Sequence, residues 1–364
     1  MNKIRVHLGE RSYDVLIGRG LIGKCGRIIG RLGIGPDAVV ITNPRVAALY
    51  RNSVEKSLKR SGFTVRFELV PDSEKAKSLR AASAVLNNLA RYDVNRRVFI
   101  VALGDGVVGD LAGFVAAVYR RGVPYVQMPT TLLAQVDSSI GGKVAVDLRV
   151  AKNLVGSFYQ PRAVISDVAA MKTLSPRQVK SGLAEIIKYG VIKDAALFRY
   201  VESNYRKILA LDADALEHVV YRSAAIKAGI VSKDELDRGS IRAILNFGHT
   251  IGHAVEAASG YSGRYDHGEA IALGMRAATE MARALGLVKE TDAARVEALI
   301  SRVGLPVAIR GIAAKRIYEA HLHDKKFTNG RNRYILAAGI GKAKVIDGVA
   351  DPIVRGALKK CMDN

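Results

Sequence analysis

The feature that most constrains this chain is a change of pattern near its middle. Up to residue 174, short apolar runs rich in Val, Ile and aromatic residues alternate with stretches of helical periodicity, and beyond it helix follows helix. The first pattern predicts an α/β domain with a largely parallel sheet, and the second predicts a mainly α-helical domain. The pair Ser175-Pro176 can cap a helix and fill its first turn. We therefore expect two domains, residues 1–174 and 175–364.

Individual elements follow from the same periodicities. Two apolar runs around a polar turn at residues 9–11 predict an N-terminal β-hairpin. Helical periodicity predicts a helix over residues 74–91. The predicted hairpin strands are residues 4–8 and 13–17; further strands are predicted at residues 38–41, 63–69, 98–103, 125–128 and 163–166, with two short late strands at 334–337 and 344–346.

The charge balance favours anionic partners. Lys and Arg number 56 against 34 acidic residues in 364, which gives a net charge of +22. Nucleic acid and a phosphorylated metabolite are both candidates. However, the basic residues lie in scattered pairs such as Arg96-Arg97 and Arg120-Arg121, and the sequence contains no recognisable nucleic-acid module. We expect a small-molecule partner and no nucleic acid.

The cysteine and hydropathy patterns suit the cytoplasm. Cys25 and Cys361 lie near opposite ends and form neither a metal-ligand spacing nor a disulfide framework. The N-terminus lacks the apolar stretch of a signal peptide, and no apolar run is long enough to span a bilayer. We expect a cytoplasmic protein with no membrane partner.

The spacing Gly-x-Gly-x-x-Gly occurs twice. At residues 18–23 it follows a hairpin strand, and it favours a turn that leads into a helix over a cofactor site. At residues 104–109 it follows a buried-looking strand and opens an apolar helix, where backbone N–H groups could hold a pyrophosphate. A tight strand-to-helix turn explains the second spacing equally well. No acid about 20 residues later completes the ordinary dinucleotide fingerprint.

A segment at residues 129–143 combines two hydroxyls with a lysine. Thr130 and Thr131 follow a predicted strand, and a Gly-Gly turn then presents Lys143. Hydroxyls and lysine suit phosphate or ribose contacts. A capped helix followed by a loop accounts for this segment equally well.

Polar groups recur on the apolar helices of the second half. Histidines together with a carboxylate suit a catalytic zinc site with an open position. Helix spacing alone pairs His249 with His253, at i and i+4. A lone buried histidine is more often a core residue, but the recurrence favours a site. The candidates are Glu185, Lys188, His249, His253, His267 and Glu269.

Taken together, these segments resemble the 3-dehydroquinate synthases. The likeness covers nearly the whole chain, and its most specific parts are residues 129–143, 152–161 and 245–250. It implies an N-terminal NAD-binding α/β domain, a C-terminal helical metal-binding domain and a homodimer. It also implies a lyase of the shikimate pathway and aromatic amino acid biosynthesis. Such an enzyme converts 3-deoxy-D-arabino-heptulosonate 7-phosphate to 3-dehydroquinate and phosphate by transient oxidation, β-elimination, reduction and aldol cyclisation.

The resemblance also implies the site residues. The resemblance assigns the metal, zinc or cobalt, to Glu185, His249 and His267. This ligand set takes the place of the pair His249 and His253 that helix spacing alone suggested. Substrate contacts are assigned to Lys143, Asn153, Lys188, Lys227, Arg242, Asn246, His253 and Lys325, with Arg121 reaching in from a partner subunit. NAD contacts are assigned to Asp72, Ser73, Glu74, Lys75, Ala76, Lys77, Gly106, Val107, Val108, Gly109, Asp110, Thr130, Thr131, Lys143, Lys152, Ala170, Met171, Lys172 and Thr173.

Three positions depart from the family pattern. Asp105 replaces a common glycine of the phosphate loop, and its carboxylate disfavours a nearby pyrophosphate unless it points away. Ala76 stands where Tyr is frequent, and Val144 where Thr is frequent. No implied metal ligand or substrate lysine is missing, so these departures bear on cofactor affinity more than on activity.

Three alternative functions compete with this reading. A metal-dependent polyol or glycerol-phosphate dehydrogenase would form NADH in net amounts. A related sugar phosphate cyclase would act on another substrate. A basic nucleic-acid-binding protein would bind DNA in a salt-dependent way without lyase activity.

Overall fold

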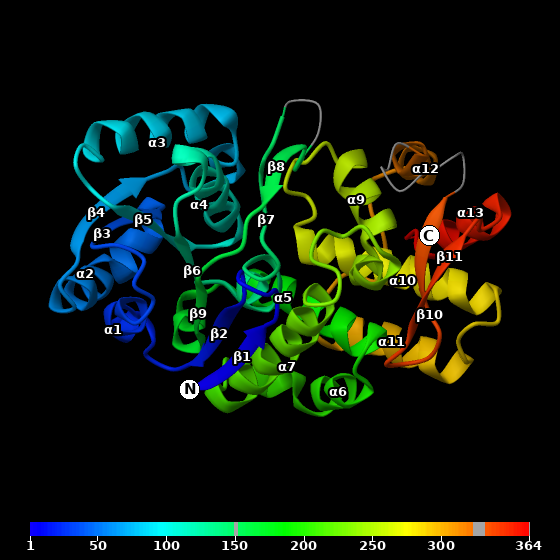
Figure 1. The fold of residues 1–364 in the computed structure, drawn as a ribbon. Helices are drawn as coiled ribbons and strands as arrows, with labels where there is room; N and C mark the ends of the chain where they lie inside the picture. The colour runs from blue at the N-terminus through cyan, green and yellow to red at the C-terminus, as the bar shows by residue number, and fades with distance from the viewer. Residues whose placement is uncertain (149–151, 323–331, 364) are drawn as a thin grey trace. The chain divides into compact units, whose positions relative to one another are not determined.

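The computed structural model describes residues 1–148, 152–322 and 332–363 (Figure 1). The chain divides into two compact units. The first comprises Met1–Leu174 together with Lys227–Leu236, and the second comprises Ser175–Ile226 and Asp237–Asn364. The sequence predicted one domain boundary, after residue 174. The structure differs in that residues Lys227–Leu236, which come later in the chain, also belong to the first unit. This segment includes the end of a long helix, and periodicity alone cannot reveal which unit a helix end joins.

The first unit is built on a seven-stranded sheet. The antiparallel hairpin β1–β2 and the five following parallel strands bear out the predicted α/β fold. The sheet order is β1-β2-β9-β6-β5-β3-β4. The strands are β1 (Asn2–Val6), β2 (Tyr13–Gly18), β3 (Asp37–Thr42), β4 (Thr64–Leu69), β5 (Val98–Gly104), β6 (Tyr125–Pro129) and β9 (Ala163–Asp167).

Helices cover both faces of this sheet (Figure 1). Successive side chains of β3 point to opposite faces, as the period of two requires. Val39 packs into a core with residues of α3 and α4, whereas Val40 packs into a second core with residues of α1 and α2. These helices are α1 (Cys25–Gly30), α2 (Pro44–Arg60), α3 (Leu79–Tyr92) and α4 (Gly106–Val118).

The predicted helix at residues 74–91 begins later than expected. Its first residues form a short 3-10 helix, η2 (Glu74–Ala76), and α3 starts only at Leu79. Ser78 has an extended backbone and accepts a hydrogen bond from the amide of Ala81 at 3.3 Å. The start of the helix is therefore set by this cap rather than by the apolar periodicity.

Smaller elements complete the first unit. An antiparallel pair, β7 (Lys143–Val146) and β8 (Val155–Phe158), was not predicted. The remaining short elements are η1 (Ile22–Lys24), η3 (Tyr119–Arg121), η4 (Ala134–Ser138) and η5 (Val168–Thr173).

The second unit is mainly helical, as predicted. Ser175 caps its first helix in a capping box with Gln178, and the two late strands pair as β10 and β11. No helix in the described part of the chain combines the length and apolarity needed to cross a membrane. The elements are α5 (Pro176–Ile192), α6 (Ala195–Leu209), α7 (Ala213–Val231), α8 (Ser240–Ala243), η6 (Ile244–Asn246), α9 (His249–Ala258), α10 (His267–Ala284), α11 (Glu290–Arg302), α12 (Ala314–Leu322), β10 (Arg333–Ala337), β11 (Ala343–Asp347) and α13 (Asp351–Lys360).

Candidate active site

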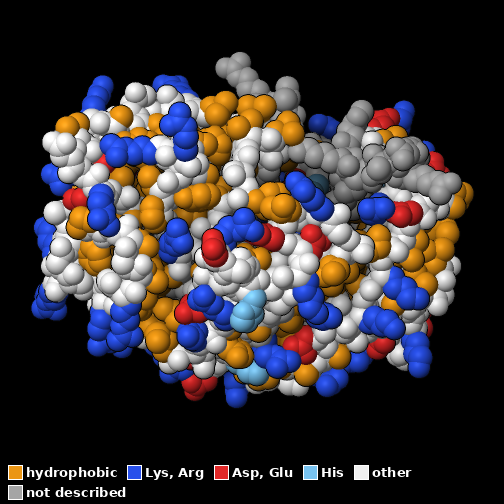
Figure 2. Space-filling model, in the orientation of Figure 1, with side chains coloured by type: hydrophobic (Ala, Val, Ile, Leu, Met, Phe, Trp, Pro, Cys, Tyr) orange, Lys and Arg blue, Asp and Glu red, His pale blue; other side chains and the backbone are white. Residues whose placement is uncertain are grey.

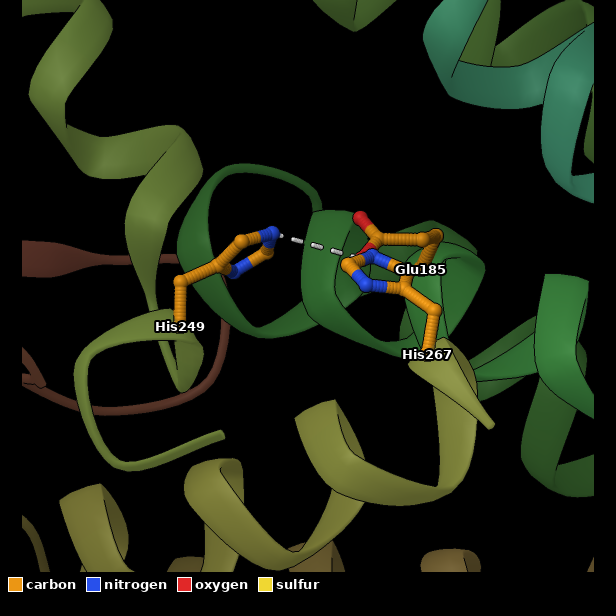
Figure 3. Close-up of side chains that lie close together, drawn as sticks. All are labelled: Glu185, His249 and His267. Atoms are coloured by element: carbon orange, nitrogen blue, oxygen red, sulfur yellow. Dashed lines mark ion pairs between the residues drawn. The ribbon is translucent and has the colours of Figure 1, made fainter. Parts of the chain in front are cut away.

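Three donor side chains meet in the second unit (Figure 3). Glu185 comes from the middle of α5, while His249 and His267 are the first residues of α9 and α10. Their ligand atoms all lie within 4.8 Å of one another. The Nε2 atoms of His249 and His267 lie 3.6 Å and 3.4 Å from the same carboxylate oxygen, Oε1 of Glu185. Two imidazole nitrogens and a carboxylate are the donor set of a catalytic zinc site.

Close helix packing makes this meeting possible. A Cβ atom on Gly268 of α10 would lie 2.3 Å from Cα of Ser181 in α5, so only glycine permits this approach. The amide of Gly268 also donates to Oγ of Ser181 at 3.1 Å. Asp266 caps α10 and accepts a hydrogen bond from the amide of Glu269 at 2.9 Å. These contacts fix the helix start that carries His267.

The orientation of His249 is set by its own turn. Its Nδ1 lies 3.1 Å from the carbonyl oxygen of Phe247. A carbonyl only accepts, so Nδ1 carries the proton and Nε2 presents its lone pair towards Glu185. This is the tautomer that a metal ligand needs.

The cluster favours positive charge. Lys188, one helical turn after Glu185, forms an ion pair with its carboxylate, and both side chains are buried. Burial lowers the pKa of His267, but the carboxylates of Glu185 and Glu256 outweigh it and raise that pKa to about 10. A divalent cation would satisfy the same carboxylates, and the residues therefore fit a metal.

His253, which helix spacing paired with His249, is not part of the cluster of Glu185, His249 and His267. Its side chain is exposed, and its ring centroid is 5.3 Å from that of His249. It forms a second group of potential ligands with Glu256 and His267. The structure thus brings His249 together with Glu185 and His267, as the resemblance implied.

Glu269 is not a member of either cluster. Its Oε2 accepts from the amide of Asp266 at 2.9 Å, which completes the capping box. The same carboxylate accepts from Arg177 at 2.6 Å and 3.0 Å. The prediction of Glu269 as a metal candidate is therefore wrong, because its side chain stabilises the start of α10.

Other implied substrate residues also lie in the second unit. Arg242 in α8 is buried with 3% exposure, and Lys188 with 1%. Asn246 ends η6, three residues before His249. Lys325 lies outside the described residues.

In the first unit, the implied cofactor segments share one edge of the sheet. Each segment comes soon after the carboxyl end of a parallel strand, and these ends lie at the same edge. Parallel α/β sheets bind ligands along this edge. The pairs of strand and segment are β4 with residues 72–77, β5 with 106–110, β6 with 130–131 and β9 with 170–173.

Ion pairs connect some of these segments. Nζ of Lys77 donates to Oδ2 of Asp110 at 2.5 Å, in a largely buried pair. Burial by itself lowers the pKa of Lys77. The nearby carboxylates, Asp110 first among them, have the opposite and together larger effect, so the pKa of Lys77 is raised and the ammonium group stays charged. Nζ of Lys152 lies 3.2 Å from Oε1 of Glu74. Two of the lysines implied in NAD binding are therefore each paired with an implied acid.

Asp105 turns towards its own helix. It is the N-cap of α4, and its Oδ1 accepts from the amide of Val108 at 3.1 Å. Burial raises the pKa of Asp105, as do the nearby carboxylates of Asp72 and Glu74. The carboxylate therefore occupies amides that would otherwise face a pyrophosphate.

The first glycine-rich spacing is a turn, as predicted. The amides of Gly20 and Ile22 both donate to the carboxylate of Asp167, each at 3.0 Å. This carboxylate fills the place that a phosphate would need.

The remaining implied substrate residues lie on other parts of the first unit. Nζ of Lys227 donates to the backbone oxygen and Oδ1 of Asp137, at 2.6 Å and 2.7 Å. This bond ties the end of α7 to η4. Lys143 begins β7, while Asn153 and Arg121 are exposed and have positive φ angles.

One residue near the metal cluster was missed by the sequence reasoning. Oε1 of Glu256 lies 3.8 Å from Nδ1 of His267. Glu256 follows His249 by seven positions and His253 by three, so all three share a face of α9. That spacing was the available signal.

Family models place the chain among known proteins. Models of the N-terminal and C-terminal parts of 3-dehydroquinate synthase match residues 68–181 and 182–327. The 3-dehydroquinate synthase of Desulforamulus reducens is 45% identical over 361 residues, covering 99% of this chain and 100% of the relative. That of Pelobacter propionicus is 46% identical over 354 residues, covering 97% and 98%.

Solved structures agree with this placement. A 2-deoxy-scyllo-inosose synthase complexed with carbaglucose-6-phosphate, NAD+ and Co2+ matches with a TM-score of 0.90 and 26% identity, covering 99% of this chain and all of that one. The 2-epi-5-epi-valiolone synthase of Streptomyces hygroscopicus, with NAD+ and Zn2+ bound, has a TM-score of 0.89 and 26% identity, covering 97% and 98%. A probable glycerol dehydrogenase from Sinorhizobium meliloti, at 15% identity over 95% of both chains and TM-score 0.66, shares the fold alone. This chain belongs to the 3-dehydroquinate synthase family.

Proposed function

We propose that this chain converts 3-deoxy-D-arabino-heptulosonate 7-phosphate to 3-dehydroquinate and phosphate, a reaction of the shikimate pathway. The observation that carries the proposal is the meeting of Glu185, His249 and His267 in a chain 45% identical to 3-dehydroquinate synthases over nearly its full length. The two related cyclases of known structure are only 26% identical to this chain. They therefore favour a different sugar phosphate substrate less strongly than the 45% identical relatives favour the heptulosonate phosphate.

The metal centre belongs to the second unit in this proposal. Glu185, His249 and His267 would hold one divalent ion, zinc or cobalt, through Nε2 of each histidine and the carboxylate. When bound, the metal polarises a substrate hydroxyl, and NAD+ accepts a hydride that is later returned. Lys188, beside Glu185, places an ammonium group next to this centre. Arg242 adds a second buried cation to the unit, and the two suit an anionic sugar acid.

The cofactor site belongs to the first unit. The edge formed by the carboxyl ends of β4, β5, β6 and β9 would bind NAD+ through the segments that follow these strands. Thr130 and Thr131 supply hydroxyls for ribose or phosphate, and the pyrophosphate would lie near the start of α4, where Asp105 already takes the amide of Val108. Gly106 opens α4, where a Cβ atom would approach Oγ of Ser138 to 3.0 Å, so this turn has little room for a side chain.

The resemblance assigns substrate contacts to polar groups in each of the two units. In the first unit, Asp137 holds the ammonium group of Lys227, and Lys143 begins β7. In the second unit, Asn246 precedes the metal ligand His249, and His253 is exposed one turn beyond it. The protein's main contributions are therefore orientation and charge stabilisation.

The oligomeric state and location are part of the proposal. A homodimer is proposed, in which Arg121 of each subunit reaches the substrate phosphate bound by the other. A guanidinium suits phosphate because it can donate two parallel hydrogen bonds. Lys and Arg side chains are spread over the face seen in Figure 2, which supports a small anionic partner over nucleic acid. A cytoplasmic location stays a prediction from the sequence.

One incubation tests the function. The purified protein is supplied with the heptulosonate phosphate, a catalytic amount of NAD+ and Zn2+, while phosphate, 3-dehydroquinate and NADH are followed. We expect phosphate and 3-dehydroquinate in equal amounts, without net NADH. NADH formed in proportion to product would instead establish a dehydrogenase. The His267→Ala variant serves as the control and should be nearly inactive.

A further inference from the structure

Glu256 lies beside the metal cluster without belonging to it. It stands on α9, two turns after His249, and its side chain is 14% exposed. Its Oε1 is 3.8 Å from Nδ1 of His267, while Nε2 of the same ring is 3.4 Å from Oε1 of Glu185. His267 is therefore flanked by two carboxylates, one on each ring nitrogen.

The two histidines of the cluster make the same kinds of contact through their two ring nitrogens. Each directs Nε2 to the same oxygen of Glu185, and each has an acceptor near Nδ1. For His249 the acceptor is the backbone carbonyl of Phe247, and for His267 it is the carboxylate of Glu256. A neutral imidazole that binds a cation through Nε2 carries its proton on Nδ1, so an acceptor there selects the correct tautomer.

We propose that Glu256 is the positioning residue of the metal centre: its carboxylate holds the Nδ1 proton of His267 and so turns Nε2 towards the metal. The inference rests on the proposed metal centre. At 3.8 Å the present gap is longer than a hydrogen bond. A movement of about 1 Å by the ring or the carboxylate closes it. Glu256 also adds a second carboxylate to the surroundings of His267, where the charge of Glu185 is shared with Lys188.

The backbone of Glu256 has a separate structural role. Its carbonyl oxygen accepts from Oγ of Ser259 at 2.7 Å and from the amide of Tyr261 at 3.1 Å, which closes the end of α9. Substitution of the side chain leaves these bonds in place. A loss of metal binding can therefore be separated from a loss of the helix end.

A second arrangement uses the same residues differently. His253, Glu256 and His267 could themselves surround an ion, because their donor atoms also lie within 4.8 Å of one another. In that case Glu256 is a ligand, and two ions share His267. The number of metal ions per chain distinguishes the two arrangements.

The test compares Glu256→Ala and Glu256→Gln with the unchanged full chain. Zn2+ affinity is measured by competition with a chromophoric chelator, and the coordination geometry by the visible absorption spectrum of the Co2+ form. We expect Glu256→Ala to weaken Zn2+ binding roughly 10- to 100-fold and to shift the cobalt spectrum, with one ion per chain throughout. Glu256→Gln should lose less, because its amide oxygen can still accept from Nδ1. Glu290→Ala, which removes an exposed carboxylate paired with Arg283, is the control and should bind like the unchanged chain.

Three outcomes decide against the role. Unchanged affinity and an unchanged spectrum in Glu256→Ala would overturn it. Two ions per chain, falling to one in Glu256→Ala, would make Glu256 a ligand instead. If Glu185→Gln also binds Zn2+ as tightly as the unchanged chain, the metal centre itself is wrong, and the role of Glu256 falls with it. Should Glu256→Ala fail to fold, which circular dichroism of the metal-free protein reveals, the same measurements on Glu256→Gln decide.

Discussion

A Cβ atom on Gly274 would lie 1.8 Å from the backbone oxygen of Gly248. Gly274 belongs to α10, and Gly248 is the N-cap of α9 with a φ angle of 79°. The two helices therefore cross in direct backbone contact. His249 follows Gly248 in the chain, and His267 lies two turns before Gly274. This crossing sets the distance between the two histidines.

Substitution of Gly274 by alanine should damage both folding and the metal centre. The added methyl group meets backbone, which cannot rotate away, so we expect the free energy of unfolding to fall by at least about 1–3 kcal/mol. Zn2+ affinity should fall at least tenfold, because α9 must move away from α10. Urea denaturation and chelator competition measure the two effects.

The control for this substitution is Gly356→Ala in α13. No heavy atom lies within 4 Å of the Cβ position there. Alanine should therefore be neutral or stabilise the helix by about 0.5–1 kcal/mol. Equal behaviour of the two alanine variants would contradict the role of the α9–α10 crossing.

Asp105 should make NAD+ affinity depend on pH. Burial raises the pKa of Asp105, and Asp72 and Glu74 raise it further, while the amides of Val107 and Val108 lower it. The anionic pyrophosphate is repelled by the carboxylate and not by the neutral acid. We therefore expect NAD+ to bind more tightly as pH falls through this raised pKa, and calorimetry over a series of pH values measures the affinity.

Asp105→Asn removes the charge and keeps a good helix cap. It should bind NAD+ roughly tenfold more tightly at pH 8, equivalent to ~1.4 kcal/mol, and show a flatter pH profile. The control is Asp212→Asn, since Asp212 accepts from the amide of Ala215 at the start of α7. If Asp105→Asn keeps the pH profile of the unchanged chain, the repulsion argument is wrong.

The pair of Lys77 and Asp110 should show strong energetic coupling. Their side chains are 8% and 18% exposed, so removing one partner leaves a largely buried charge. Lys77→Met and Asp110→Asn should each lower the free energy of unfolding by about 3 kcal/mol. The double variant should lose clearly less than the sum, as a double-mutant cycle in urea measures. Additive losses would show that the pair is not coupled.

Mixed dimers should test the proposed role of Arg121. Arg121→Ala and Glu185→Ala are each expected to be nearly inactive. In a mixed dimer, one site has an intact metal cluster and receives Arg121 from its partner, so activity should return after subunit exchange. If mixed dimers form and both single variants are impaired, yet no activity returns, the cross-subunit role is refuted. Recovery should approach the share of intact sites in the mixture.

Much of the fold could be predicted because its signals are local. The apolar run at residues 38–41 predicted strand β3, and the Ser175-Pro176 pair marks the start of α5. Both depend only on residues a few positions apart. The start of α3 was missed because the cap at Ser78 competes with an apolar periodicity that begins earlier.

The sequence by itself indicated the strands of the main sheet, the helical second half and the residue types available for a site. It related His249 to His253, because a helix fixes the i and i+4 relation locally. Only the tertiary structure decided that His249 meets Glu185 and His267, and that Glu256 faces the other nitrogen of His267. It also decided that Asp105 turns to Val108. These relations depend on helix crossings and side-chain rotamers, which long-range packing selects and no local period encodes.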